Sequence, residues 1–208
     1  MDLVITAARI YGLSLNGTQD LRYGRFVAQR QSKAAMLSLA LLRHAKSSWD
    51  ATDIEDFDRP LNERGRSAAP VMGAALQDLN FTPELILCSP AKRTRETLAL
   101  ISSFVKDCEV AFDEELYLTS QDRLYGRLKA VPVGIKKVLM IGHNPGMHGL
   151  ALHLAGTGDA KSLSRLEDKF PTAALALFSF EQDFWRDLLP ASGRLEAFTT
   201  PRDRAETG

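Results

Sequence analysis

The sequence predicts an α/β fold: a three-layer α/β/α sandwich in which helices cover both faces of a mostly parallel sheet. From Met36 onward, strand-like and helix-like stretches alternate, as they do where helices connect parallel strands. Several of the strand-like stretches are continuous apolar runs, which is typical of strands buried on both faces. No composition break or internal repeat divides residues 36–200. We therefore expect a single domain there.

Six strands are predicted from short apolar runs bounded by turn-forming or charged residues. They are residues 37–42, 84–89, 109–112, 137–142, 173–180 and 194–200. The first of these runs, LSLALL, is followed at once by Arg43 and His44 and then by Lys46. A core strand that ends in this much positive charge needs a partner for that charge.

Five helices are predicted from apolar residues at helical spacing. They are residues 62–79, 90–104, 121–131, 145–156 and 162–170. The first contains Pro70 and Gly73, and both residue types weaken a helix. The second is expected to begin with Ser89 as its N-cap and Pro90 at the first helical position.

The two ends of the chain differ from the rest. Residues 1–35 hold five basic and two acidic residues, so residues 36–208 hold 21 basic and 24 acidic ones. Three interpretations of residues 1–35 stay open: a segment outside a native protein that starts at Met36, an Arg-rich and acid-poor targeting segment, or a loosely ordered arm. Residues 201–208 are polar, and we expect a frayed tail.

The composition argues against two classes of partner and indicates the compartment. Lys+Arg and Asp+Glu balance at 26 each, which argues against a nucleic acid or a membrane surface as partner. No apolar run reaches the roughly 18 residues of a membrane span. Cys88 and Cys108 lack CxxC spacing and lie in or beside apolar runs, so we expect two buried thiols in a reducing, cytoplasmic compartment.

The residues that carry chemistry follow three of the predicted strands. Arg43 and His44 end the first, Arg93 lies one turn into the helix after the second, and His143 follows the strand at 137–142. Ligands of open α/β sheets bind beyond the carboxyl ends of the strands, so parallel strands would place these side chains in one pocket. Guanidinium groups and helix N-termini favour a tetrahedral anion such as a phosphoryl group. The arginines should also lower the pKa of His44 and keep it a neutral nucleophile.

Three other functional assignments have less support in the sequence than this phosphoryl pocket. Arg95 competes with Arg93, but two residues apart on a helix they face nearly opposite directions, so only one can reach the pocket. His148 and His153 lie five residues apart, which is not the i, i+4 spacing of a two-histidine metal site. A dinucleotide-binding domain would need G-x-G-x-x-G after the first strand, and RHAKSS has no glycine.

The segments LLRHAKSSWD, CSPAKRTRETL and IGHNPG, together with DFDRPLNERGR, resemble the motifs of the histidine phosphatase superfamily, the phosphoglycerate mutase-like proteins. Within that group they resemble the SixA-type phosphohistidine phosphatases. The resemblance covers about residues 37–200. It departs from the RHG signature of the family at Ala45, which replaces the glycine.

The resemblance implies a phosphoglycerate mutase-like fold without a metal or an organic cofactor. It implies that His44 becomes phosphorylated, while Arg43, Arg93 and His143 hold the phosphoryl oxygens.

The implied function is that of a phosphohydrolase acting on phosphohistidine in a protein. Two alternatives stay open: a phosphatase of sugar phosphates or similar small metabolites, and a non-catalytic phosphate-binding module. Many members of the family place a proton-donating carboxylate after the third strand, where this chain has Glu114 and Glu115. SixA-like members are thought to act without one.

Overall fold

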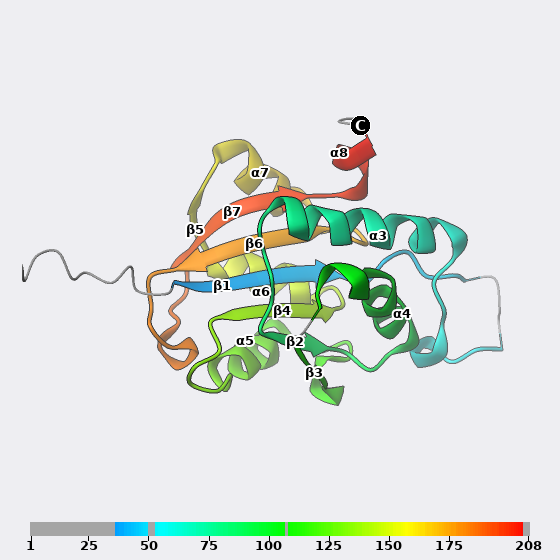
Figure 1. The fold of residues 1–208 in the computed structure, drawn as a ribbon, viewed down its shortest axis with the longest axis horizontal. Helices are drawn as coiled ribbons and strands as arrows, with labels where there is room; N and C mark the ends of the chain where they lie inside the picture. Colours follow the sequence, from blue (N-terminus) through cyan, green and yellow to red (C-terminus); the bar gives the residue numbers. More distant parts are fainter. Residues whose placement is uncertain (1–35, 50–52, 107, 206–208) are drawn as a thin grey trace, which may run out of the picture. The chain divides into compact units, whose positions relative to one another are not determined.

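The computed structural model of the chain describes residues 36–49, 53–106 and 108–205. The expectations for residues 1–35, and for the last three residues of the tail, lie outside these ranges. Within them, helices cover both faces of one sheet (Figure 1), which confirms the predicted α/β fold.

The sheet has seven strands in the described part of the chain, in the order β3-β2-β4-β1-β6-β7-β5. The strands are β1 (Leu37–Arg43), β2 (Leu85–Cys88), β3 (Glu109–Phe112), β4 (Lys137–Gly142), β5 (Ala155–Gly158), β6 (Leu175–Phe180) and β7 (Gly193–Thr199). β1, β2, β3 and β4 run parallel to one another, and β5 runs parallel to β7. β6 is antiparallel to both of its neighbours, β1 and β7. The sheet is therefore mixed but mostly parallel, as predicted.

The helices form the two outer layers. They are α3 (Glu63–Asp78), α4 (Lys92–Ile101), α5 (Gln121–Lys129), α6 (Gly146–Leu154), α7 (Ala160–Asp168) and α8 (Pro201–Ala205). Short 3₁₀ turns are η1 (Asp56–Asp58), η2 (Ser102–Phe104), η3 (Glu114–Leu116) and η4 (Trp185–Asp187). In Figure 1, α3 and α4 lie in front of the sheet and α6 lies behind it.

Successive side chains of β1 point to opposite faces of the sheet, because a strand repeats every two residues. Leu39 and Leu41 are fully buried in the core under α5 and α6, while Ala40 and Leu42 are fully buried in the core under α3 and α4. Both faces of the strand are covered, which explains why its sequence is continuously apolar.

Three expectations about elements were wrong. Residues 155 and 156, assigned to the end of a helix, belong to the edge strand β5 (Ala155–Gly158). The second helix begins at Lys92 with Ala91 as its N-cap, so Ser89 does not cap it and Pro90 precedes it. The described part of the tail is not frayed, because residues 201–205 form α8.

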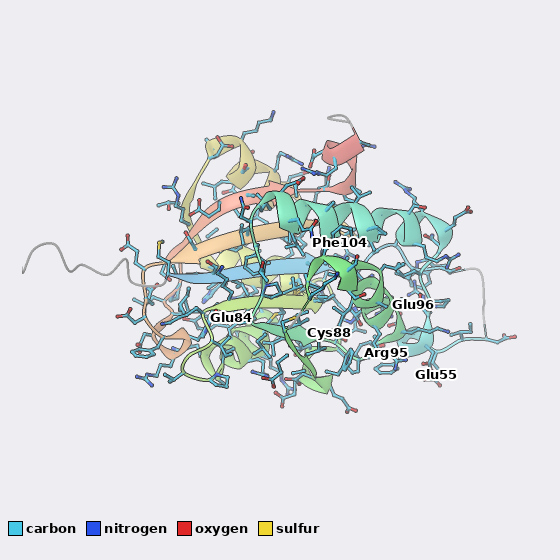
Figure 2. All side chains as sticks on the ribbon, in the orientation of Figure 1. Glu55, Glu84, Cys88, Arg95, Glu96 and Phe104 are labelled. Carbon is cyan, nitrogen blue, oxygen red and sulfur yellow. The ribbon has the colours of Figure 1, made fainter. Side chains whose placement is uncertain are left out.

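The parallel strands β1, β2 and β4 all end on the same side of the sheet. Figure 2 labels Glu84, just before β2, and Cys88 at its carboxyl end, and β1 runs in the same direction. The segments that carry Arg43, Arg93 and His143 therefore leave the sheet at one edge. No helix among the described residues is long and apolar enough to cross a membrane.

Candidate active site

His44 is the first residue after β1, and its backbone N–H donates to Gly142 O at 3.1 Å. Its side chain is 7 % exposed, and its Nδ1 lies 2.7 Å from Ala45 O. A carbonyl oxygen can only accept a hydrogen bond, so Nδ1 carries the proton and Nε2 keeps its lone pair. Ala45 is itself fixed, because its N–H donates to Thr97 Oγ1 at 3.0 Å. The local backbone thus selects the tautomer in which Nε2 can act as a nucleophile.

His143 lies beside His44, with the ring centroids 5.1 Å apart. It follows β4, is 3 % exposed, and its Nε2 lies 2.8 Å from Ser89 Oγ at the end of β2. Its Nδ1 is buried and has no hydrogen-bond partner among the described residues. If the Ser89 hydroxyl donates to Nε2, Nδ1 of the neutral ring carries a proton and becomes a free donor.

Arg43 joins the site to the loop before β6. Its Nη1 donates to Phe170 O at 2.9 Å, and the Asn144 amide donates to the same oxygen at 2.9 Å. The Nε of Arg43 is buried and unpartnered among the described residues. Arg43 therefore has one anchored nitrogen and one buried donor that is still available.

Arg93, the second residue of α4, is 3 % exposed. Its Nη2 donates to a carboxylate oxygen of Asp56 at 2.9 Å, and its Nη1 donates to the Asp56 carbonyl at 2.5 Å. Arg95 is exposed, and Figure 2 shows it with Glu96 on α4 beyond the carboxyl end of β1. The structure therefore turns Arg93 inward and Arg95 outward, as helix geometry requires.

Asp56 is the main site residue that the sequence did not single out. Its carboxylate accepts from Arg59 Nη1 at 2.7 Å and from Tyr117 Oη at 2.7 Å, in addition to Arg93. The Tyr117 ring in turn meets the His143 ring edge to face, with centroids 5.4 Å apart. Asp56 lies in the segment DFDRPLNERGR, but no sequence pattern singled out Asp56 or Tyr117.

Arg59 ties η1 to the loop after β1. Its Nη2 donates to Ser47 Oγ at 2.7 Å and its Nε to Ser48 O at 2.9 Å. The exposed ring of Trp49 lies over the guanidinium carbon of Arg59, with 3.2 Å from that carbon to the ring centroid. Arg59 thereby brings a third guanidinium group close to His44.

Both site histidines are neutral at physiological pH. Burial is the largest cause that lowers the pKa of His44 to about 3, and the positive charges of Arg93, Arg43 and Arg59 lower it further. Burial likewise is the largest cause that lowers the pKa of His143 to about 3. The positive charges of His44, when it is protonated, and of Arg93 lower this pKa further. The sequence predicted this direction for His44 from the arginines alone, whereas removal from water has the larger effect.

The pKa of Asp56 moves in the opposite direction. Partial burial raises it, but the hydrogen bonds from Tyr117 and Arg59 and the charge of Arg93 outweigh burial and lower the pKa to about 2. Asp56 is therefore an anion at neutral pH. The site then carries three guanidinium charges against one carboxylate, an excess of positive charge that suits an anionic ligand.

Several other expected residues stay away from the two histidine rings. Glu114 and Glu115 are exposed in η3, and neither carboxylate bonds to Arg43, Arg93 or the histidines within the described residues. On α6, His148 bonds to Leu166 O and His153 to Gln121. Across the described ranges, no three or more His, Cys, Asp or Glu side chains gather as a metal site would require.

The chain is similar to several known proteins. A family model described as the histidine phosphatase superfamily (branch 1) matches residues 39–131. An uncharacterised protein of Mycobacterium tuberculosis (strain H37Rv) is 32 % identical over 163 residues, which make up 77 % of this chain and 100 % of that protein.

Two solved structures share the fold at similar levels of identity. A protein from Agrobacterium tumefaciens, described as a candidate phosphohistidine phosphatase SixA, is 30 % identical with a TM-score of 0.67, covering 79 % of this chain and 98 % of its own. A protein from Nakamurella multipartitia with the same description is 28 % identical with a TM-score of 0.69, covering 80 % and 96 %.

Proposed function

This chain belongs to the histidine phosphatase superfamily, and from that premise we propose that it hydrolyses phosphohistidine in a protein through a phosphorylated His44. In this proposal Arg43, Arg93 and His143 hold the phosphoryl oxygens. Two observations support this proposal: the ring centroids of His44 and His143 lie 5.1 Å apart, and Nε2 of His44 keeps its lone pair. Within the described ranges, Arg43 Nε and His143 Nδ1 are buried without a hydrogen-bond partner. In the tautomer in which Ser89 donates to His143 Nε2, both are further donors for oxygen.

The first step transfers the phosphoryl group. His44 Nε2 attacks phosphorus in line while the P–N bond to the substrate imidazole breaks. The proton on the other substrate nitrogen stays there, so the substrate leaves as neutral imidazole. Phospho-His44 keeps its own Nδ1 proton, and Ala45 O, 2.7 Å away, stabilises the resulting positive ring.

The second step returns the enzyme to its starting state. Water attacks the phosphorus, the P–Nε2 bond breaks, and inorganic phosphate leaves with the protons of the water. His44 becomes neutral again with its proton still on Nδ1. The positive groups around it stabilise the charge that builds up on the equatorial oxygens in both steps.

One observation favours a phosphoramidate over a phosphate ester. Among the described residues, the carboxylate that contacts the arginines of the site is Asp56, and its pKa of about 2 leaves no proton to donate at neutral pH. An alkoxide leaving group needs a proton donor. Protonated phosphoimidazole already carries the proton with which its imidazole leaves, so a site without an acid can cleave it.

The names of the similar proteins support the same substrate class. The solved structures from Agrobacterium tumefaciens and Nakamurella multipartitia are described as candidate SixA phosphohistidine phosphatases. We place the protein in a reducing, cytoplasmic compartment, which is consistent with the lack of a disulfide between Cys88 and Cys108. Cys88 is buried as expected, whereas Cys108 is only half-buried. We also propose that the reaction needs no metal, since the arginines supply the positive charge that a cation would bring.

The test is to trap the intermediate. Wild-type protein is mixed with a ³²P-labelled phosphohistidine peptide and quenched in alkali, where phosphohistidine survives. We expect label on the wild type and on His148→Gln, a control histidine on α6, and none on His44→Ala. Turnover by His44→Ala should fall at least a thousandfold.

Three results would contradict the proposal. Equal turnover by His44→Ala would remove His44 as the nucleophile. Turnover of sugar phosphates with none of the peptide would favour the small-molecule alternative, while binding of phosphate with no turnover of either would favour the non-catalytic one.

A further inference from the structure

We propose that a cavity next to the histidine pair binds acidic side chains that flank the phosphohistidine of the substrate protein; this inference rests on the proposed function. The cavity, which we call the basic cavity, has a volume of about 620 Å³. Its walls come from the residues after β1, the start of α3, the end of α7 with the loop to β6, and α8. A volume of this size holds several side chains rather than one small ion.

The basic cavity carries a clear excess of positive charge. Its charged lining residues are Lys46, Arg64, Arg165, Lys169 and Arg202 against Asp168 and Asp203. The chain as a whole has a formal net charge of zero, so this excess of three is a local concentration. Unbalanced like charges repel one another, and an acidic ligand would relieve that repulsion.

The two acids are already neutralised by neighbours within the cavity. Asp203 accepts from Arg165 at 2.5 Å and also from Thr200, and Asp168 lies 3.1 Å from Lys169. Lys46, Arg64 and Arg202 form no ion pair with any residue that the structure describes. These three cations come from three separate segments, and all three are exposed. They can therefore meet carboxylates that arrive from outside.

The basic cavity shares a wall with the histidine pair. The N–H of Ala173, a cavity residue, donates to the carbonyls of Arg43 at 3.2 Å and His44 at 3.1 Å. The carbonyl of Phe170, at the other end of this wall, accepts from the Arg43 guanidinium. Lys46 follows His44 by two residues. A peptide whose phosphohistidine meets His44 would thus pass the cavity with its neighbouring residues.

The size of the basic cavity favours an acidic peptide over a second phosphate group. A single phosphate is best held by donors that converge on it, whereas a volume of about 620 Å³ is much larger than one phosphate and has room for several carboxylate side chains. The lining also includes Ala68 and Phe198, which can contact the aliphatic parts of glutamate side chains.

The experiment compares two phosphohistidine peptides that differ only in three flanking residues, Glu in one and Gln in the other. For wild type we expect kcat/KM to be at least tenfold higher on the Glu peptide, mainly through KM. In the double variant Arg64→Gln/Arg202→Gln the ratio should fall to below threefold. Raising NaCl from 50 to 500 mM should reduce the wild-type ratio in the same way, because salt screens exposed charges.

The control is Arg123→Gln/Arg186→Gln, which removes the same charge from exposed arginines outside the basic cavity. It should keep the wild-type preference. Equal rates of wild type on both peptides would overturn this inference and leave the proposed phosphatase intact. A preference for small bisphosphates that the cavity variant loses would assign the cavity to a second phosphate and overturn it too. Failure to hydrolyse any phosphohistidine compound would instead reject the proposed function.

Discussion

A single hydrogen bond decides which nitrogen of His44 is reactive. The Ala45 carbonyl, 2.7 Å from Nδ1, holds the proton there and leaves Nε2 free. Ala45 is fully buried, and its methyl group packs in the core under α3 and α4 at the position where the family signature has glycine. The alanine is therefore compatible with the site, since the hydrogen bonds of this position to His44 and Thr97 come from its backbone.

Asp56 is a positioning residue for Arg93. Its carboxylate contacts Arg93, Arg59 and Tyr117 together, so it fixes the guanidinium that we propose holds a phosphoryl oxygen. Its negative charge also opposes the binding of an anion at the same place. The positioning of Arg93 should affect kcat, whereas the negative charge should affect the inhibition constant of inorganic phosphate.

We predict that Asp56→Asn lowers kcat on a phosphohistidine peptide about tenfold. This is less than the roughly 10²–10³-fold cost of removing a transition-state donor, because Arg93 is displaced and not removed. Inhibition by inorganic phosphate should become tighter, because one negative charge is lost beside Arg93. Steady-state kinetics with phosphate as inhibitor measures both effects.

Asp58→Asn is the matched control, since Asp58 lies in the same 3₁₀ turn and is exposed. It should leave kcat and the inhibition constant unchanged. An unchanged kcat in Asp56→Asn would show that Arg93 does not need this carboxylate for its position.

At the level of elements, α3 shows how tertiary packing changes the effect of a glycine on stability. Asn62 caps the helix by accepting from the Gly65 N–H at 2.9 Å, and the helix continues across Pro70. A Cβ at Gly73 would clash with the ring of Phe104, which lies beside α3 (Figure 2). Gly73 weakens the helix by itself but allows α3 to pack closely on η2.

We predict that Gly73→Ala lowers the free energy of unfolding by about 1–3 kcal/mol, because overpacking outweighs the gain in helix propensity. Gly126→Ala in α5 is the control, since nothing lies within 4 Å of a Cβ there. That variant should gain up to about 1 kcal/mol. Urea unfolding of both variants measures the difference, and a stabilised Gly73→Ala would contradict the packing argument.

The start of α4 shows the same dependence on neighbours. Ser89 and Pro90 form a local pattern that favours a helix start, yet the Ser89 hydroxyl bonds to His143 and the helix begins two residues after Pro90. A side chain that can cap a helix can equally bond to a group brought near by the fold. Ser89 thus orients a histidine of the site.

For the whole molecule, the parallel arrangement of β1, β2 and β4 brings two histidines into one buried place, and this makes stability depend on pH. Both pKa values are about 3 in the folded protein, whereas an unfolded histidine binds a proton near pH 6.5. Between these values the unfolded state binds more protons. The histidines therefore contribute their stabilisation above about pH 6.5, and it is lost as the pH falls.

We predict that the free energy of unfolding decreases from pH 6.5 to 4.5 with a slope of up to about 1.4 kcal/mol per pH unit for each histidine. Asp56 loses its contribution only as the pH falls from about 3.8 to about 2, outside this window. Urea midpoints at half-unit pH intervals measure the slope. His143→Gln should reduce it by about half, and an unchanged slope would show that this histidine is not responsible.

Many local features follow from the sequence. Short apolar runs predicted six of the seven described strands. Four of them, β1, β2, β4 and β6, are buried on both faces, and such a strand has few other compositions available. β5, with the sequence AGTG, was missed because it has no apolar pattern. The candidates Arg43, His44, Arg93 and His143 could be proposed from the sequence because each lies at the end of a recognisable strand or one turn into the helix that follows it.

The tertiary structure alone decided which groups meet at those strand ends. Asp56 contacts Arg93 across 37 residues of sequence and Tyr117 across 61, and no local periodicity records such pairs. The basic cavity likewise combines α3, α7 and α8, which are distant in the chain. Periodicity reports which face of an element is buried, whereas contacts between distant side chains exist only after the helices have packed on the sheet.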